Sequence, residues 1–206
     1  MTRAPNFDPV ARIYRWAEYL TLGPLLQRTR THFLPQLADR RCALVLGDGD
    51  GRFLAKLLAG NPTLHATAVD SSEAMLQLLR SRCGTGRLET IHADALTVGA
   101  PPGIDLIVTH FFLDCFTQEE IDALALRLAR PGVLWLVSDF RARGLISRVY
   151  VRSLYFAFRV LTGLRVSRLP DPGTALSGAG FHRVTQHQIL GGLLYTELWQ
   201  GEEHFS

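Results

Sequence analysis

Short apolar runs alternate with segments of helical periodicity from about residue 42 onward. An apolar run of four to eight residues bounded by turn residues predicts a buried strand, whereas apolar positions three or four residues apart predict a helix. Strands are therefore expected at 42–46, 65–70, 88–92, 105–110 and 133–139, with helices between them. This alternation is typical of βαβ units that build a parallel sheet.

The end of the chain departs from this alternation. Two strand-like segments, 184–190 and 193–200, follow each other closely and are separated by Gly191-Gly192, a dipeptide suited to a two-residue hairpin. The prediction is an α/β fold: a doubly wound, seven-stranded sheet, mostly parallel, with a C-terminal antiparallel hairpin and helices on both faces.

Composition bounds the number of domains. With 206 residues, 47% of them hydrophobic and 20% charged, the chain suits one well-packed domain. We expect that domain to span 1–206 and to consist of an N-terminal helical segment (1–40), a core (41–140), an apolar helical insertion (141–175) and the hairpin (176–206).

Charge and cysteine content exclude several function classes. The net charge is only +3, and the basic residues, 21 Arg and one Lys, are scattered, so a nucleic-acid partner is not expected. The three cysteines are far apart and form no C-x-x-C, which argues against a disulfide framework or a bound metal. The polar N-terminus and the lack of an apolar run of about 18 residues predict a soluble, cytoplasmic protein.

The richest chemical signal is a glycine turn after the first strand, where Gly47, Gly49 and Gly51 form G-x-G-x-G before a helical pattern. Glycines here let the backbone turn sharply and approach a ligand closely. A dinucleotide fingerprint would need a third glycine where Arg52 stands. Asp48 and Asp50 would repel a pyrophosphate but would attract a cation, such as the sulfonium and ammonium groups of S-adenosylmethionine.

This stretch resembles motif I of the class I S-adenosylmethionine-dependent methyltransferases. The resemblance implies a Rossmann-like fold and S-adenosylmethionine as cofactor, with Gly47, Gly49 and Gly51 cradling its methionine and sugar portion. The family usually has an acidic residue two places before the first glycine. Val45 stands there in this chain, and Asp48 could replace that side chain.

Two further strand ends carry acidic residues that could contact the same cofactor. Asp70 closes the second strand, where a carboxylate can accept hydrogen bonds from both ribose hydroxyls, and Ser71 follows it; the alternative is that Asp70 only caps the next helix. After the third strand, the resemblance implies that Asp94 accepts from the adenine amine beside the amide of Ala95. Together the three strand ends favour a cofactor site over a purely structural turn.

The fourth strand ends at His110, before a loop that a Thr117–Glu120 capping box closes. His110 could act as a general base with a pKa near the working pH, or it could pack or contact the cofactor. Asp114 could act directly or could serve as a structural carboxylate at a helix N-terminus. Asp139, at the end of the fifth strand, is a third candidate. Alignment alone can accelerate methyl transfer, so a dedicated acid or base is not required.

Residues 7–28 form a helical pattern that breaks at Gly23-Pro24. The segment resembles the entry segment of the ubiquinone and menaquinone biosynthesis C-methyltransferases, and the resemblance extends over roughly residues 7–140. It implies that Tyr14 lies near the methyl donor, although Arg15 stands where those relatives usually have aspartate. A helix that covers the sheet edge is the plainer alternative.

Residues 145–161 are aliphatic and aromatic, with Arg148, Arg152 and Arg159 on one helical face. Such a helix could roof an apolar substrate pocket, rest on a membrane surface, pair with a second subunit, or pack in the core with its arginines in solvent. The expected function is methyl transfer to a small, apolar molecule. A catalytically silent scaffold and a nicotinamide oxidoreductase are the alternatives, and Arg52 and the loop aspartates disfavour the latter.

Overall fold

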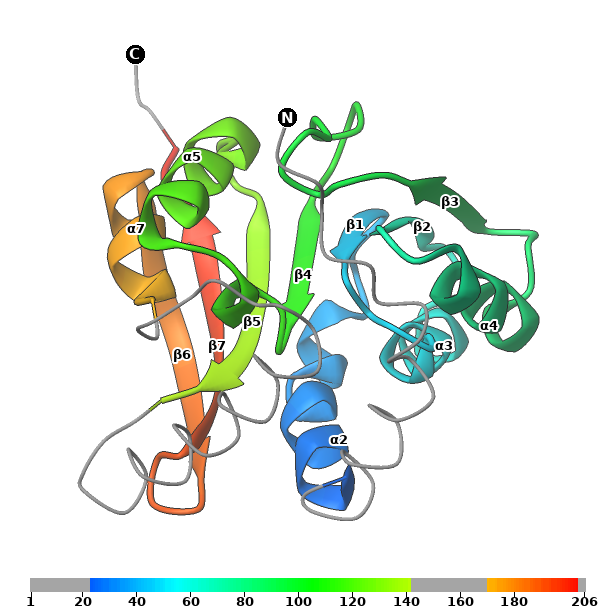
Figure 1. Ribbon diagram of the computed structural model, residues 1–206, viewed down its shortest axis with the longest axis horizontal. Helices are drawn as coiled ribbons and strands as arrows, with labels where there is room; N and C mark the ends of the chain where they lie inside the picture. The colour runs from blue at the N-terminus through cyan, green and yellow to red at the C-terminus, as the bar shows by residue number, and fades with distance from the viewer. Residues whose placement is uncertain (1–22, 142–169, 204–206) are drawn as a thin grey trace.

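The computed structural model describes residues 23–141 and 170–203, which form one seven-stranded sheet with helices on both faces (Figure 1). The strand order is β3-β2-β1-β4-β5-β7-β6. The first five strands in this order run parallel, and β7 pairs antiparallel with β5 and with β6. The strands are β1 (Cys42–Leu46), β2 (His65–Asp70), β3 (Leu88–His92), β4 (Leu106–His110), β5 (Leu134–Phe140), β6 (Phe181–Ile189) and β7 (Leu194–Gly201). This is the doubly wound, mostly parallel sheet with a C-terminal hairpin that the sequence predicts.

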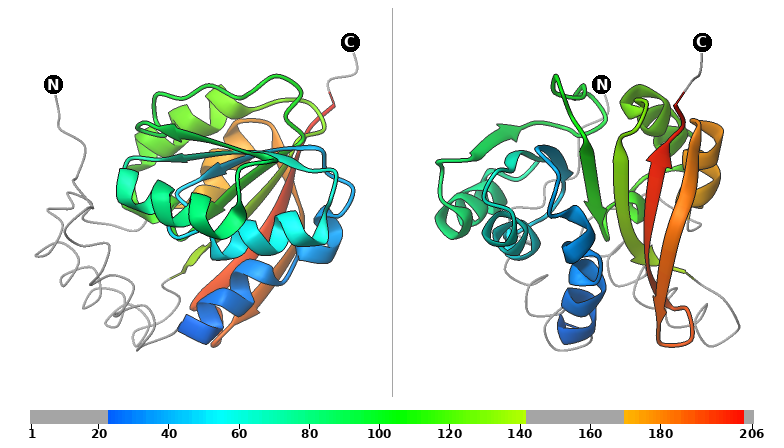
Figure 2. Two further views of the ribbon diagram at one scale, coloured as in Figure 1. Left: turned by 90° about the vertical axis from the view of Figure 1, so that its right-hand side faces the viewer. Right: turned by 180° about the vertical axis from the view of Figure 1, so that it is seen from behind.

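Helices cover the sheet in two layers (Figure 2). The helical elements are α2 (Gly23–Thr31), η1 (Leu34–Leu37), α3 (Arg52–Gly60), α4 (Glu73–Cys83), η2 (Leu113–Cys115), α5 (Gln118–Leu128) and α7 (Pro172–Gly178). On one face, Phe53 and Leu57 of α3 and Leu79 of α4 pack against alternate residues of the central strands. On the other face, α5 and α7 bury their apolar sides against the opposite set. Each central strand is therefore buried on both faces, which explains its continuous apolar run.

Local chemistry sets where the helices begin. The capping box predicted for α5 is present: the Glu120 amide donates to Thr117 Oγ1 (3.3 Å), and the Thr117 amide donates to Glu120 Oε2 (2.8 Å). The N-cap of α4 is Ser72, whose hydroxyl accepts from the Met75 amide (3.3 Å). The N-cap of α3 is instead Gly51, which has a left-handed backbone (φ 77°). The glycine turn therefore ends where the first helix of the core starts.

The predicted hairpin is present, but its turn is longer than the sequence suggests. Strand β6 ends at Ile189 and β7 begins at Leu194, so four residues rather than two connect them. Leu190, Gly191 and Gly192 all have positive φ (54°, 62° and 89°). The prediction of a two-residue turn is wrong because Leu190 joins the glycines in the left-handed region and the turn opens by one residue on each side.

Strand register brings the carboxyl ends of the central strands to one edge of the sheet. Leu46 of β1 pairs with Val69 of β2 and with Thr109 of β4. Asp70 of β2 pairs with His92 of β3. The loops that follow β1, β2, β3 and β4 therefore meet at this edge. Residues 1–22 and 142–169, which include Tyr14 and the apolar segment 145–161, lie outside the described part of the chain.

Candidate functional site

The glycine turn lies at the point where the strand order reverses. Strand β1 is flanked by β2 on one side and β4 on the other, and in such sheets the loops at this reversal hold the ligand. Gly47, Gly49 and Gly51 all have positive φ (66°, 62° and 77°). A Cβ on Gly49 would meet no atom within 4 Å, so the backbone there is open to close approach. Among the three glycines of the turn, Gly49 is thus the one that no other part of the described structure covers.

The other two glycines are required by the protein itself. A Cβ on Gly47 would lie 2.2 Å from Cδ2 of Phe112, and one on Gly51 would lie 3.0 Å from the Cα of Leu79. The Phe112 ring therefore rests on the glycine turn, and α4 packs against its end. Only a residue without a side chain permits either contact.

The acidic residues of the turn are partly neutralised. Asp50 pairs with Arg52 Nε and Arg82 Nη1, both at 3.0 Å. Burial raises the pKa of Asp48 to about 7; the Arg30 guanidinium opposes this rise, while the charges of Asp50 and Asp70 add to it. Asp48 Oδ2 accepts from the amide of Leu54 (3.1 Å), and so ties the turn to α3.

Asp70 and Ser72 form the turn after β2. The Ser72 amide donates to Asp70 Oδ1 (2.9 Å), which is the capping role that the sequence also allows. The Asp70 side chain is half-buried, and its charge contributes to the raised pKa of Asp48. Ser71 is exposed, and its carbonyl lies 3.0 Å from His92 Nε2. A carboxylate has about four acceptor positions and can accept several hydrogen bonds at once.

Asp94 and Ala95 occupy the corresponding turn after β3. Asp94 Oδ1 accepts from the Leu96 amide (2.9 Å), and Ala95 is buried with its carbonyl held by the Arg127 guanidinium (3.2 Å). The amide of Ala93 donates to the carbonyl of Asp70 (3.2 Å), which links this turn to the one after β2. The residues predicted to meet adenine and ribose therefore lie on adjacent turns.

His110 is buried at the end of β4, with 3% of its surface exposed. Its ring packs edge-on against Phe53, with the ring centroids 4.3 Å apart. Burial, with the Arg30 guanidinium nearby, lowers the pKa of His110 well below its usual value. The expectation of a pKa near the working pH is thus wrong, because the sequence does not show this burial. Neither ring nitrogen has a hydrogen-bond partner in the described structure.

Arg30 is a residue that the sequence did not single out. It lies on α2, its guanidinium carbon is 5.1 Å from the centroid of the Phe111 ring, and its charge acts on both Asp48 and His110. In the sequence, Arg30 is one of 21 arginines, and nothing in its local pattern distinguishes it from the others. Its place in the site follows from the packing of α2 against α3 and β7.

Aromatic side chains line the loop after β4. Phe112 and Phe116 stack edge-on at 5.0 Å between centroids, and Phe111 lies 5.0 Å from Phe140 at the end of β5. Phe111 has a positive φ (52°), which is strained for a bulky residue, and its amide donates to the carbonyl of Ser138 (2.7 Å). Such strain persists only where packing imposes it, and it is frequent at functional sites.

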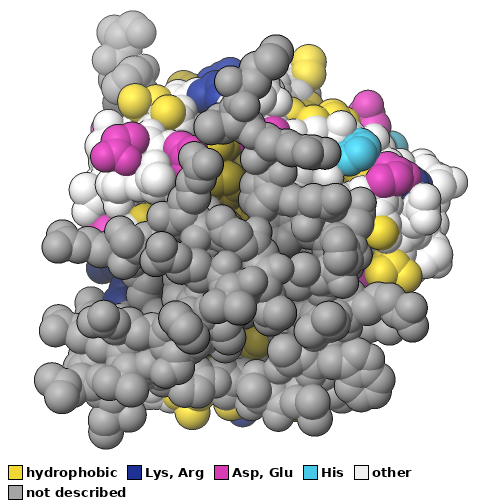
Figure 3. Space-filling view, viewed as in Figure 1, with side chains coloured by type: hydrophobic (Ala, Val, Ile, Leu, Met, Phe, Trp, Pro, Cys, Tyr) yellow, Lys and Arg dark blue, Asp and Glu magenta, His cyan; other side chains and the backbone are white. Residues whose placement is uncertain are grey.

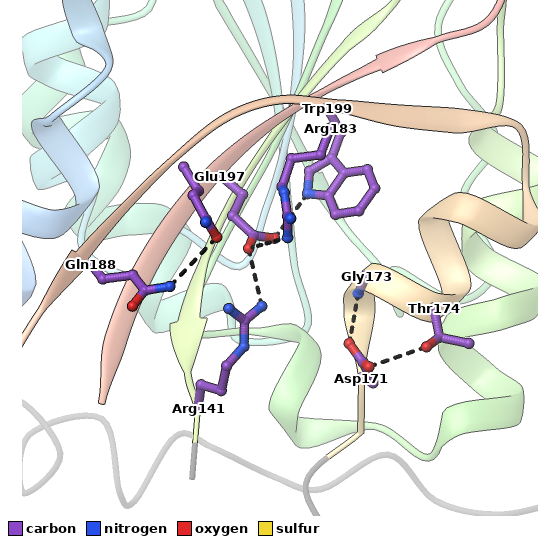
Figure 4. Close-up of polar contacts among 9 residues, drawn as sticks. Arg141, Asp171, Gly173, Thr174, Arg183, Gln188, Glu197 and Trp199 are labelled. Atoms are coloured by element: carbon purple, nitrogen blue, oxygen red, sulfur yellow. Dashed lines mark hydrogen bonds and ion pairs between the residues drawn. The ribbon is translucent and has the colours of Figure 1, made fainter. Parts of the chain in front are cut away.

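Two acidic side chains, Asp139 near the end of β5 and Glu197 in the middle of β7, lie on the face that α5 and α7 cover. Glu197 is 1% exposed and fully engaged: Arg141 (3.0 Å), Arg183 (3.1 Å) and Trp199 Nε1 (3.1 Å) all contact its carboxylate (Figure 4). Asp139 is 2% exposed, and its Oδ1 accepts from the amide of Phe140 (2.8 Å). Asp114 of η2 lies close enough to Asp139 for its charge to contribute to the raised pKa of Asp139.

The described part of the surface shows neither a patch of one charge sign nor a group of metal ligands. In Figure 3 the acidic and basic side chains on the coloured part of the surface are scattered rather than gathered into a patch of one sign. Within residues 23–141 and 170–203, no group of three His, Cys, Asp or Glu residues could hold a metal ion. In the same ranges no helix has the length and apolar character needed to cross a membrane.

The residues at this edge fit S-adenosylmethionine. Three carboxyl groups, those of Asp48, Asp50 and Asp70, gather at the turn, where arginines pair with Asp50 and burial raises the pKa of Asp48 to about 7. This acidic set suits a ligand with a sulfonium and an ammonium and disfavours a pyrophosphate. The open backbone at Gly49 permits close approach of the ligand. The donor and acceptor set thus matches the chemistry of the ligand.

Sequence comparison points to the same cofactor class. A family model described as a methyltransferase domain matches residues 43–132. The chain is 28% identical to the ubiquinone/menaquinone biosynthesis C-methyltransferase UbiE of Methylobacterium nodulans, over 91% of this chain and 85% of the relative. It is 31% identical to UbiE of Azotobacter vinelandii, over 61% of this chain and 59% of the relative. The second match thus spans about three fifths of the relative's length.

Solved structures establish the fold. The mitomycin 7-O-methyltransferase MmcR superposes with a TM-score of 0.69 at 18% identity, over 95% of this chain and 60% of that one. The N-methyltransferase NodS of Bradyrhizobium japonicum, in complex with S-adenosylhomocysteine, superposes with a TM-score of 0.63 at 16% identity, over 86% of this chain and 88% of that one. Residues 43–132 are thus a class I S-adenosylmethionine-dependent methyltransferase domain, in a chain similar to the ubiquinone/menaquinone biosynthesis C-methyltransferases.

Proposed function

We propose that this protein transfers the methyl group of S-adenosylmethionine to a small, largely apolar acceptor molecule. The observation that carries the proposal is the contact between Phe112 and Gly47, which joins the cofactor turn to an aromatic loop. An acceptor bound against this loop would lie beside the bound cofactor. The names of the relatives support a quinone precursor as one such acceptor.

In this proposal, the turn residues bind and orient the cofactor. Gly49 admits it, Asp70 holds the ribose, and Asp94 with the amide of Ala95 holds the adenine. Bound S-adenosylmethionine supplies an electrophilic methyl group on its sulfonium sulfur. The chain's contribution is to align the acceptor with that methyl group and to exclude water, which by itself lowers the barrier substantially.

His110 takes a different role from the one expected of it. Because its pKa is lowered well below the usual value, its imidazole is neutral at pH 7 and is a weak base. Its unpartnered ring nitrogens suit a hydrogen bond to the bound cofactor or acceptor. We assign it to ligand binding rather than to proton abstraction.

Calorimetric titration of the purified protein with S-adenosylmethionine, S-adenosylhomocysteine and NADH is the first test. We expect micromolar or tighter binding of the first two and no binding of NADH. Transfer of a tritiated methyl group into solvent-extractable products, screened over phenols and hydroquinones, then tests the acceptor class. Tight cofactor binding with no transfer to any small molecule would contradict the proposed activity and favour a scaffold role.

A further inference from the structure

Asp139 of β5 differs from Glu197, the buried carboxylate of the neighbouring strand β7. Both are almost fully buried, but Glu197 has two arginines and an indole on its oxygens, whereas Oδ2 of Asp139 has no hydrogen-bond partner in the described structure. Burying a polar atom without a hydrogen-bond partner destabilises the folded state. Stability alone gives no reason to keep this carboxyl.

The surroundings of Asp139 come from three elements. Asp114 and Cys115 belong to η2, Arg141 directly follows β5, and Tyr195 lies opposite Asp139 on β7. The Cys115 thiol donates to Asp114 Oδ1 (3.6 Å), and the Arg141 guanidinium lies over the Tyr195 ring at 4.0 Å. Arg141 is also committed to Glu197, so the nearest cation is shared with another carboxylate.

The electrostatics of this cluster indicate that Asp139 and Asp114 are not both ionised. Burial, and next the charge of Asp114, raises the pKa of Asp139 well above its ordinary value, against the opposing effect of the Phe140 and Asp114 amides and of Arg141. Burial and the same two carboxyls raise the pKa of Cys115. Two carboxylates that share a site do not both ionise readily at neutral pH.

We propose that Asp139 and Asp114 form the polar anchor of the acceptor site and bind a hydroxyl group of an otherwise apolar acceptor. The location supports this assignment, because η2 belongs to the aromatic loop after β4 and Asp139 ends the neighbouring strand. The inference rests on the proposed methyl transfer and narrows its substrate class to phenols, enols and similar hydroxylated apolar molecules.

The anchor also gives the released proton a destination. Methyl transfer to a hydroxylated acceptor forms a bond between the methyl carbon and the acceptor oxygen or ring carbon, and breaks the bond from that methyl carbon to sulfur. The acceptor loses one proton, S-adenosylhomocysteine leaves with a neutral sulfur, and the carboxyl pair takes the proton. The pair returns the proton to water when the product leaves.

The test compares wild type with Asp139→Asn, an almost isosteric change, using 1-naphthol and its methyl ether as probes in the presence of saturating S-adenosylhomocysteine. We expect wild type to bind 1-naphthol at least tenfold more tightly than the ether. In the variant this preference should fall to threefold or less, with the affinity for S-adenosylhomocysteine changed by less than twofold. Asp39→Asn, an exposed aspartate paired with Arg40, is the matched control and should keep the preference.

A second readout does not depend on any acceptor. Because the pKa of Asp139 is raised in the folded state, its contribution to stability is present at low pH and is lost as pH rises through the folded-state value. Urea unfolding should therefore show a smaller decline in midpoint between pH 5 and pH 8 for Asp139→Asn than for wild type. If Asp139→Asn does not fold, Asp114→Asn takes its place. That variant should show the same loss of preference for 1-naphthol over its ether, and the same smaller decline in unfolding midpoint between pH 5 and pH 8.

The outcomes separate the two proposals. Failure of wild type to bind S-adenosylhomocysteine would contradict the proposed function. Tight binding of S-adenosylhomocysteine together with no preference for the hydroxyl probe, or with a preference that survives Asp139→Asn, would overturn the anchor alone.

Discussion

The three glycines of the turn fall into two groups that differ in what surrounds them. Gly47 and Gly51 leave room for Phe112 and Leu79, whereas Gly49 has open space at the position of a side chain. All three have positive φ, so each would be strained as any other residue. The motif thus combines one glycine with open space beside it and two that allow neighbouring elements to approach.

This division predicts different costs for alanine substitutions. Gly49→Ala should lower the free energy of unfolding by about 1 kcal/mol, the cost of a left-handed alanine. Gly47→Ala should cost more, about 2–4 kcal/mol, because the Phe112 ring must also move. Urea unfolding of both variants is the measurement, and equal losses would contradict the packing role of Gly47.

Asp70→Asn separates capping from ligand binding. The asparagine oxygen can still accept from the Ser72 amide, so the fold should persist, while S-adenosylmethionine affinity should fall by about tenfold or more, as expected for the loss of a charged acceptor. Asp105→Asn is the control, since Asp105 accepts from the amides of Arg41 (2.8 Å) and Cys42 (2.9 Å) at the other end of β1. It should reduce stability but not affinity. Unchanged affinity in Asp70→Asn would remove Asp70 from the site.

At the scale of elements, the attachment of α2 decides whether Arg30 reaches the site. Helix α2 packs on α3, β6 and β7, and Leu26 of α2 contacts the small apolar cluster of Phe111 and Leu194. His32, just after α2, stacks on His187 of β6 with ring centroids 3.7 Å apart and planes 8° from parallel. This stacked pair adds a pH-dependent contact to an otherwise apolar attachment.

Protonation should weaken the attachment of α2. Burial, then the nearby His187 and Arg28, lowers the pKa of His32, so the folded state favours the neutral ring. The resulting stability is present above the unfolded pKa of about 6.5 and is lost as pH falls through the folded-state value. His110 contributes in the same direction. His187→Gln should therefore flatten, but not abolish, the decline in unfolding midpoint between pH 7 and pH 5; an unchanged decline would show that His187 does not contribute to the lowered pKa of His32.

At the scale of the whole molecule, the order of strands assembles the site. The reversal between β1 and β4 places the glycine turn beside the aromatic loop, and β5 places Asp139 next to that loop. By the proposed assignment, a cofactor bound at this edge would contact the turns after several strands at once. Its binding is therefore coupled to the stability of the whole sheet.

Cofactor binding should accordingly raise the melting temperature. At a ligand concentration about 100 times its Kd, mass action stabilises the folded state by about 2.7 kcal/mol. For a chain of this length, that corresponds to a rise of about 5–10 °C. Differential scanning calorimetry with S-adenosylhomocysteine is the measurement, and NADH at the same concentration should cause no rise. A similar rise with NADH would contradict the cofactor assignment.

Local patterns were sufficient for most of the sheet. Strands β1, β2 and β3 have the predicted bounds, whereas β4 differs from prediction by one residue at its start and β5 by one residue at each end. Their apolar runs are buried on both faces, which makes the pattern easy to identify. Strand β6 begins at Phe181, three residues before its predicted start, because its exposed outer residues obscure the alternation at an edge of the sheet.

The sequence by itself determined the strands, the capped helix, the glycine turn and the acidic strand ends, because each depends on residues close together in the chain. Only the tertiary structure decided that Phe112 rests on Gly47, that Arg30 acts on Asp48 and His110, and that Asp139 is buried with one oxygen unpartnered. These features depend on contacts between distant segments. Burial, which sets the pKa of each group, exists only once those segments pack together.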